Sequence, residues 1–287
     1  MYKLYEAQLK SKDNPYGQRE ITATENPFLD GPCLLCISAG GIGIDKNVFG
    51  TTKRGMEMAR MRVRGQQNAG FTLKDFPVKF LSIKLDTKSQ DKKITEDERI
   101  DLFVTQYLLP LISSNGTKID CIQAMKNMRN VNIMSYCDGT LVVQDIEQKL
   151  LDKMQELGYS DEECVKIQSQ MCMFSIATDR LTGKQKSTCV SFKDINDLEV
   201  SDNVTPDESQ KVSESSIGEA FFEHSNNEIE YLFNGNGDHG LKKYTHSGMA
   251  MSACLSSALS RALENSILNA RGEIFIPINA RTTYDWF

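Results

Sequence analysis

The segment that decides the fold covers residues 131–157 and has the sequence VNIMSYCDGTLVVQDIEQKLLDKMQEL. Its first part, VNIMSYC, is an apolar run of strand length. Its last part, from about residue 141, places apolar residues at helical spacing. The segment therefore predicts a buried strand that passes through a short turn, Asp138-Gly139, into a helix.

Apolar runs and helical patterns alternate along most of the chain. Strands are predicted at residues 2–9, 19–24, 32–41, 76–86, 131–137, 171–178, 187–192 and 228–233. Helices are predicted at residues 51–64, 95–112, 141–157, 158–170 and 250–268. Strands separated by helices imply crossover connections, which bring the strands together in parallel. We therefore predict an α/β fold, a mostly parallel central sheet with helices on both faces.

We expect residues 1–287 to form a single domain, because the chain contains no internal repeat and has ordinary globular composition. One stretch differs from the rest. Residues 201–216, SDNVTPDESQKVSESS, are polar and acidic and contain no aromatic residue. This composition favours a mobile surface insertion.

Charge argues against a nucleic-acid partner, and hydropathy argues against a membrane span. The formal net charge is −6 and the pI is about 5.3, so electrostatics favours no nucleic-acid partner. No apolar run approaches the length of a membrane span, and the N-terminus has no signal-peptide pattern. We expect a cytoplasmic protein, whose oligomeric state the sequence does not indicate.

The eight cysteines are scattered through apolar runs of a long chain. This distribution is typical of reduced, buried thiols rather than disulfides. Cys33 and Cys36 form a CxxC, but the second half of a zinc site is missing. We therefore expect no metal and no cofactor.

The end of the strand at residues 131–137 carries the strongest signal for chemistry. In an open parallel sheet, catalytic groups gather at the carboxyl ends of strands. A nucleophile on a sharp strand-to-helix turn needs small residues two positions before and after it, as Ser135 and Gly139 are here. Cys137 is thus the candidate nucleophile. The helix N-terminus would lower the pKa of its thiol, and the charge of Asp138 would oppose this.

A thiol nucleophile needs a histidine base, and the chain has three histidines. His239 and His246 both lie between the last predicted strand and the last predicted helix. His224 precedes that strand and is the poorest candidate. The sequence pattern leaves His239 and His246 open.

An orienting acid should come from another strand end. Asp194 and Asp197, in SFKDINDLEV, follow one strand, and Asp179 follows another. An oxyanion hole would use the backbone N–H of Asp138, together with a second N–H from Ala39 or Gly40 in the turn after residues 32–37.

Over residues 32–268 the chain resembles the α/β-hydrolase superfamily, specifically its esterase and lipase-like branch. SYCDGT at residues 135–140 is similar to that family's elbow, with Cys137 in the place of the usual serine. FKDINDLEV resembles the strand end that carries the orienting acid in that superfamily. This resemblance implies that the acid is Asp197, with Asp194 as the alternate. GLKKYTHSGM resembles the histidine loop of that superfamily. This resemblance favours His246 as the base, with His239 as the alternate.

Two departures from the family pattern affect what the resemblance implies. Cysteine replaces serine, as also happens in dienelactone-hydrolase-like and polyhydroxyalkanoate-synthase-like members. The first loop has SAGG at residues 38–41, where a histidine-glycine pair is common. These changes bear on substrate and activity more than on fold.

Three functions follow from these patterns. The leading one is a hydrolase or acyl transferase that uses a Cys-His-Asp triad on an ester or thioester, with a small-molecule or lipid-like acyl substrate. The second is a catalytically inactive fold that serves in binding or assembly. The third, a phosphate-binding glycine loop at residues 39–50, fits neither GxGxxG nor a P-loop.

Overall fold

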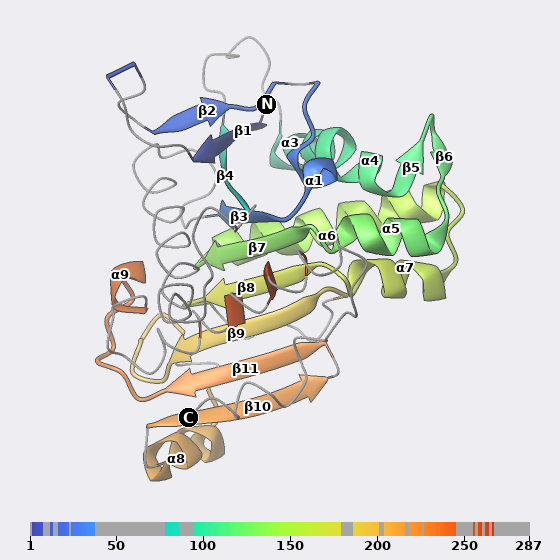
Figure 1. Ribbon diagram of the computed structural model, residues 1–287. Helices are drawn as coiled ribbons and strands as arrows, with labels where there is room; N and C mark the ends of the chain where they lie inside the picture. Colours follow the sequence, from blue (N-terminus) through green and yellow to red (C-terminus); the bar gives the residue numbers. More distant parts are fainter. Residues whose placement is uncertain are drawn as a thin grey trace, which may run out of the picture.

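A computed structural model describes the chain over most of its predicted elements (Figure 1). The described residues are 2–7, 12–13, 17–22, 24–37, 78–85, 95–178, 186–200, 204–215, 218–225 and 227–244, together with 255, 258, 259, 262, 263 and 266. The predicted helix at residues 51–64 lies outside this set.

The described part of the chain contains a nine-stranded sheet and a separate two-stranded hairpin. The sheet order is β10-β11-β9-β8-β7-β3-β4-β1-β2. Its strands are β1 (Tyr2–Ala7), β2 (Gln18–Glu20), β3 (Cys33–Ile37), β4 (Lys79–Leu85), β7 (Val131–Tyr136), β8 (Cys172–Ile176), β9 (Thr188–Asp194), β10 (Glu219–Ser225) and β11 (Glu228–Phe233). The hairpin is formed by β5 (Ser113–Ser114) and β6 (Thr117–Lys118).

Nine further helical elements are described over complete ranges. They are α1 (Pro27–Asp30), α3 (Glu96–Phe103), the π-helical η3 (Val104–Leu108), α4 (Leu109–Ile112), α5 (Cys121–Met128), α6 (Gly139–Glu156), α7 (Asp161–Gln168), α8 (Pro206–Glu214) and α9 (Leu241–Tyr244). None of the described helices is long and apolar enough to cross a lipid bilayer.

Parallel pairing dominates the sheet, which confirms the predicted α/β class. From β4 through β3, β7, β8 and β9 to β11, every neighbouring pair is parallel. Antiparallel pairs occur only towards the two edges, where β10 pairs with β11 and β1 pairs with both β4 and β2. The carboxyl ends of the parallel strands therefore share one edge of the sheet, beside α9 in Figure 1.

The chain changes direction across the sheet at β3. It places β4 on one side of β3 and β7 on the other. A crevice at the carboxyl ends of strands is expected where the strand order reverses in this way. Cys137 follows β7 directly, at this position.

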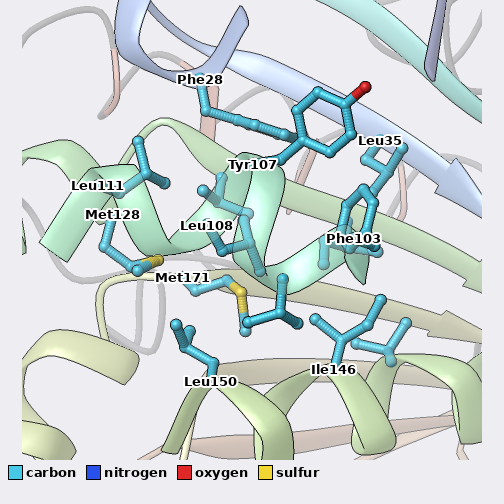
Figure 2. Close-up of a cluster of buried hydrophobic side chains, with 14 of the residues drawn as sticks. Phe28, Leu35, Phe103, Tyr107, Leu108, Leu111, Met128, Ile146, Leu150 and Met171 are labelled. Atoms are coloured by element: carbon cyan, nitrogen blue, oxygen red, sulfur yellow. The ribbon is translucent and has the colours of Figure 1, made fainter. Parts of the chain in front are cut away.

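A large apolar core lies between one face of the sheet and the helices α3 to α7. Figure 2 shows Ile146 and Leu150 of α6 pointing towards η3, which carries Leu108, whereas Tyr107 of η3 points away from α6 and lies beside Phe28. All five side chains are buried. Burial of apolar side chains at helical spacing is what holds α6 against the sheet.

The opposite face of the sheet carries a second apolar core. Alternate residues of β8, β9 and β11 face it, including Phe174, Phe192 and Tyr231. Their partners are helical residues near the C-terminus, namely Leu255, Ala258, Leu259, Ala262 and Leu263. These partners follow the i, i+3, i+4 spacing of a buried helix face, and they lie within the predicted helix at residues 250–268.

The predicted helix at residues 95–112 begins as expected but is not continuous. Thr95 accepts a hydrogen bond from the Glu98 N–H, and the Glu98 side chain accepts one from the Thr95 N–H, which is a capping box. The α-helix then gives way to the π-helical turn Val104–Leu108. Pro110 follows at the start of α4, and its lack of an N–H removes one α-helical hydrogen bond.

Residues 204–215 differ from the mobile insertion that the composition of residues 201–216 suggested. Pro206–Glu214 form α8, whose N-cap Thr205 makes a capping box with Glu208. Val212 is completely buried, so the helix packs through this apolar side chain despite its polar composition. The TPDE signal of the cap was present in the sequence and was outweighed by the acidic composition around it. The following strand, β10, was not predicted.

The cysteines within the described residues are free thiols, as expected. Cys33 packs in the core on one face of the sheet, and Cys36 packs in the core on the other. Positions three apart in a strand face opposite sides, so these two thiols cannot share a metal or a redox site.

Two leucines of α6 test how much the core contributes to stability. We expect Leu150→Ala to lower the free energy of unfolding by about 2–5 kcal/mol, because this fully buried side chain leaves a cavity. Leu141→Ala is the matched control, since Leu141 is 58% exposed, and should change stability by less than about 0.5 kcal/mol. Urea unfolding followed by circular dichroism measures both. Equal effects would contradict the placement of α6.

Candidate functional site

Cys137 lies on a strained turn between β7 and α6. Its φ angle is 52°, which places a non-glycine residue in the left-handed region. The Cys137 N–H donates to the Ile176 carbonyl at 2.9 Å, and α6 begins two residues later at Gly139. Strain of this kind costs about 1–3 kcal/mol and is concentrated at functional positions. The turn has the strand-to-helix form predicted from the sequence.

Buried hydroxyl groups fasten this turn to the sheet. The Ser135 and Thr140 hydroxyls are 2.9 Å apart, and those of Thr140 and Ser175 are also 2.9 Å apart. All three residues are buried. Ser135 is the next-to-last residue of β7 and Thr140 is the second residue of α6, so their hydrogen bond joins the strand to the helix across Cys137.

The loops after β9 and β11 are held together by the carboxylate of Asp194. Asp194 is buried and accepts hydrogen bonds from the backbone N–H groups of Asn196, Gly235 and Gly237, at 2.9–3.0 Å. Gly237 has a φ of +75°, and a Cβ there would lie 2.5 Å from the Asn196 carbonyl oxygen. The two loops therefore approach so closely that one of them needs glycine.

His239, in the loop after β11, is oriented by Asp197 in the loop after β9. The His239 Nδ1 lies 2.7 Å from Asp197 Oδ2, and the Asp197 side chain is 1% exposed. The Tyr244 hydroxyl donates to the same Oδ2 at 2.7 Å. Burial raises the pKa of Tyr244, so its hydroxyl stays protonated and remains a donor. The contact with Asp197 directs His239 Nε2 away from the acid.

Tyr136 connects the turn of Cys137 to the histidine loop. Its hydroxyl donates to the His239 carbonyl at 2.5 Å, and its ring lies 5.6 Å from the His239 ring, centroid to centroid. Burial raises the pKa of Tyr136 to about 12, so the hydroxyl is a donor at neutral pH. The residue before the candidate nucleophile thus positions the candidate base.

Cys137, His239 and Glu199 form one cluster. The Cys137 Sγ, a ring nitrogen of His239 and a carboxylate oxygen of Glu199 all lie within 4.8 Å of one another. His239 Nε2 is 3.3 Å from Glu199 Oε2, but among the described residues this buried nitrogen has no hydrogen-bond partner of acceptable geometry. Distances between nucleophile and base are often longer without substrate than in the reacting complex.

The resting form of Cys137 is the neutral thiol. Burial raises its pKa above the ordinary value, and the negative charges of Asp138 and Glu199 act in the same direction. A hydrogen bond from the Asp138 N–H opposes them. The Asp138 charge acts in the direction expected from the sequence, but burial is the largest cause of the raised pKa, and the N–H has a larger effect than the charge of either acid.

The predicted site residues separate into three groups. The structure brings Cys137, Asp197 and the alternate histidine His239 together. Asp194, the alternate acid, instead binds backbone N–H groups, while Asp138 is the exposed N-cap residue of α6. The remaining candidates, Ala39, Gly40, Asp179 and His246, lie outside the described residues.

Three residues of the site were not singled out from the sequence. They are Glu199, Tyr136 and Tyr244. Glu199 had a weak signal, because it follows the candidate acid by two residues at the same strand end. The contacts of the two tyrosines had no signal in the sequence. Tyr136 binds His239, about a hundred positions away, and Tyr244 binds Asp197, about fifty positions away.

Replacing Asp138 tests the charge effect on Cys137. We expect Asp138→Asn to lower the pKa of Cys137, because it removes a negative charge that disfavours the thiolate but keeps the backbone N–H. The midpoint of the pH dependence of Cys137 alkylation by iodoacetamide should therefore move to lower pH. Mass spectrometry of the labelled peptide measures it. Asp152→Asn, elsewhere on α6, is the control and should leave the midpoint unchanged. A midpoint that moves up in Asp138→Asn would contradict this electrostatic account.

Replacing Gly235 tests the contact between the two loops. A Cβ at this position would lie 2.2 Å from Asp194 Oδ2, and that carboxylate is already held by three N–H groups. We expect Gly235→Ala to lower the free energy of unfolding by about 1–3 kcal/mol in a urea titration.

Gly240→Ala is the control for this substitution. It lies in the same loop, and its Cβ would meet only the exposed Asp238 side chain, at 3.1 Å. Asp238 can turn away, so the change should be about 0.5 kcal/mol or less. A Gly235→Ala protein as stable as the control would show that the loops are not in close contact.

The chain matches no protein-family model, and it matches no curated protein. A fold does not by itself define an activity, because one fold supports many chemistries. Function must therefore be inferred from the residues that the fold brings together at Cys137.

Proposed function

We propose that the protein is a hydrolase or acyl transferase that acts on an ester or thioester through a covalent thioester at Cys137. One observation carries this proposal. A cysteine on a strained strand-to-helix turn lies within 4.8 Å of a histidine whose other ring nitrogen is held by a buried aspartate. This is the arrangement that nucleophilic catalysis requires of a nucleophile, its base and an orienting acid.

The chemistry proceeds in two steps. His239 Nε2 accepts the thiol proton as the Cys137 sulfur attacks the acyl carbonyl, and the leaving group takes that proton when the acyl bond breaks. Water or another acceptor then attacks the thioester, again with His239 as base. Asp197 holds Nδ1–H and stabilises the imidazolium that forms in each step. Because the resting thiol is neutral, proton transfer accompanies attack instead of preceding it.

The oxyanion that forms during attack requires N–H donors. The Asp138 N–H interacts with the Cys137 sulfur and is thus next to the reacting carbon in this proposal. A second donor from Ala39 or Gly40 remains a prediction from the sequence.

An α/β-hydrolase-like fold is part of the proposal. Cys137, Asp197 and His239 keep the chain order nucleophile, acid, histidine of that superfamily. They follow β7, β9 and β11, three parallel strands of one sheet. The support comes from this order and from the shape of the turn at Cys137.

Exposed side chains near the cluster favour an apolar acyl group. Leu198, between Asp197 and Glu199, is 85% exposed, and Leu141, in the first turn of α6, is 58% exposed. Exposed acids, Asp138 and Glu199, accompany them. Exposed leucines with acidic residues near them in the chain support an uncharged, lipid-like acyl substrate over an anionic one.

A second candidate function is a catalytically inactive fold used for binding. Two observations favour it. The pKa of Cys137 is raised, and Glu199 contacts the nitrogen of His239 that would accept the proton. Both reduce the reactivity of the thiol in the resting state.

Acyl labelling of Cys137 distinguishes the two functions. With a thioester probe, we expect Cys137 to be acylated at least about a hundredfold faster than Cys121, because general-base assistance contributes about that much. His239→Ala and Asp197→Asn should each remove the advantage, while His246→Ala should keep it. Labelled peptides are quantified by mass spectrometry.

Cys121 is the internal control, since it is the other partly buried thiol among the described residues. Equal, slow labelling of Cys137 and Cys121 would reject the enzyme and favour the inactive fold. Loss of labelling in His246→Ala alone would assign the base to that residue instead of His239.

A further inference from the structure

We propose that Cys137, Glu199 and His239 bind a single zinc ion, and that zinc and an acyl group compete for the Cys137 sulfur. The three ligand atoms already lie within 4.8 Å of one another. The metal site follows from this geometry alone, whereas the competition rests on the proposed function. No metal is expected from the sequence, because the CxxC of Cys33 and Cys36 lacks the second half of a zinc site. The three ligands proposed here are far apart in the chain and form no ligand motif.

The ligand types suit zinc. Thiolate, imidazole and carboxylate are its usual protein ligands, and three of them leave a fourth position for water. Tetrahedral zinc, with ligands at about 2.0–2.3 Å, places its ligand atoms about 3.5 Å apart. His239 Nε2 and Glu199 Oε2 are already 3.3 Å apart. The sulfur lies within 4.8 Å of both atoms, so it must approach each of them by at most about 1.3 Å.

An independent observation concerns the surroundings of His239. A histidine that binds metal usually donates its other N–H to a carboxylate, which fixes the ring. His239 Nδ1 is 2.7 Å from the buried Asp197, and Tyr244 donates to that same carboxylate. Nε2 is buried, and it has no hydrogen-bond partner within the part of the chain that the structure describes. A buried nitrogen without a partner is costly, and a metal ion would satisfy it.

The loops that carry the ligands are also held in place. The Asp194 carboxylate binds Asn196 in the loop of Glu199, and Gly235 and Gly237 in the loop of His239. Cys137 lies on the fixed turn before α6. Little conformational entropy is therefore lost when the three ligands converge on an ion.

Binding of zinc exchanges a proton for a metal. The S–H bond of Cys137 breaks, an S–Zn bond forms, and the proton passes to solvent, with no change in oxidation state. The sulfur and His239 Nε2 are then both occupied, so neither can take part in acyl transfer. Conversely, an acylated sulfur carries no negative charge with which to bind zinc.

Titration with Co²⁺, a spectroscopic substitute for zinc, tests the metal site. We expect a thiolate-to-metal charge-transfer absorption in the wild-type protein. Cys137→Ser should abolish it, and Glu199→Gln should weaken metal affinity at least about tenfold. Cys121→Ser and Glu163→Gln are the controls. They remove a thiol and a carboxylate that interact with each other outside the cluster of Cys137, and both should leave the titration unchanged. Glu199 is largely exposed, so its variant keeps the test meaningful even if Cys137→Ser is unstable.

Several results would overturn the proposal. A charge-transfer band that persists in Cys137→Ser would place the metal on other thiols. Unchanged affinity in Glu199→Gln would reject the three-ligand site. If zinc binds but does not slow thioester labelling of Cys137, the competition is rejected.

The metal titration requires no turnover, and labelling requires no metal. Failure of the proposed function would therefore appear as slow, unselective labelling of zinc-free protein, whatever the titration shows. Failure of the metal site would appear in the titration alone.

Discussion

Parallel hydrogen bonding across β7, β8, β9 and β11 is the constraint on which the site depends. Parallel strands end at the same edge of the sheet, so the turn of Cys137 and the loops of Asp197 and His239 must meet there (Figure 1). Residues a hundred positions apart in the chain become neighbours without any local signal. Two apolar cores, one on each face, hold the strands in this register.

Two buried aspartates at the carboxyl end of β9 have different structural roles. Asp194 accepts hydrogen bonds from three backbone N–H groups and holds the loops after β9 and β11 together. Asp197 contacts His239 and the Tyr244 hydroxyl. Each carboxylate requires these contacts, because a buried carboxylate is stable only when its oxygens are hydrogen-bonded. The first carboxylate positions the loop that supplies His239, and the second orients its ring.

The site contains opposing effects on reactivity. The strained turn and the Asp138 N–H favour a reactive sulfur, while burial and two acidic side chains keep the thiol protonated. Glu199 also occupies space beside His239 Nε2. A thiol that is neutral at rest and sits between a base and a carboxylate suits reactions in which the incoming ligand, an acyl carbonyl or a metal ion, completes the activation.

The sequence by itself determined the strand and the helix on either side of Cys137 and the position of the turn between them. The apolar run of β7, the helical spacing of α6 and the small residues around Cys137 are local patterns, and local patterns predict local structure. The interruption of the helix at residues 95–112 and the cap of α8 were not predicted. Pro110 lies in a pattern that predicts one continuous helix, and Thr205 lies in a polar, acidic stretch that suggests a mobile insertion.

Only the tertiary structure decided which side chains share the site. The sequence left His239 and His246 open, and the resemblance favoured the second, but the described fold places His239 against Asp197. The fold also brings Glu199 and Tyr136 to His239, and Tyr244 to Asp197. Such contacts depend on the order of strands in the sheet and on the path of each loop, which are properties of the whole chain that no short segment encodes.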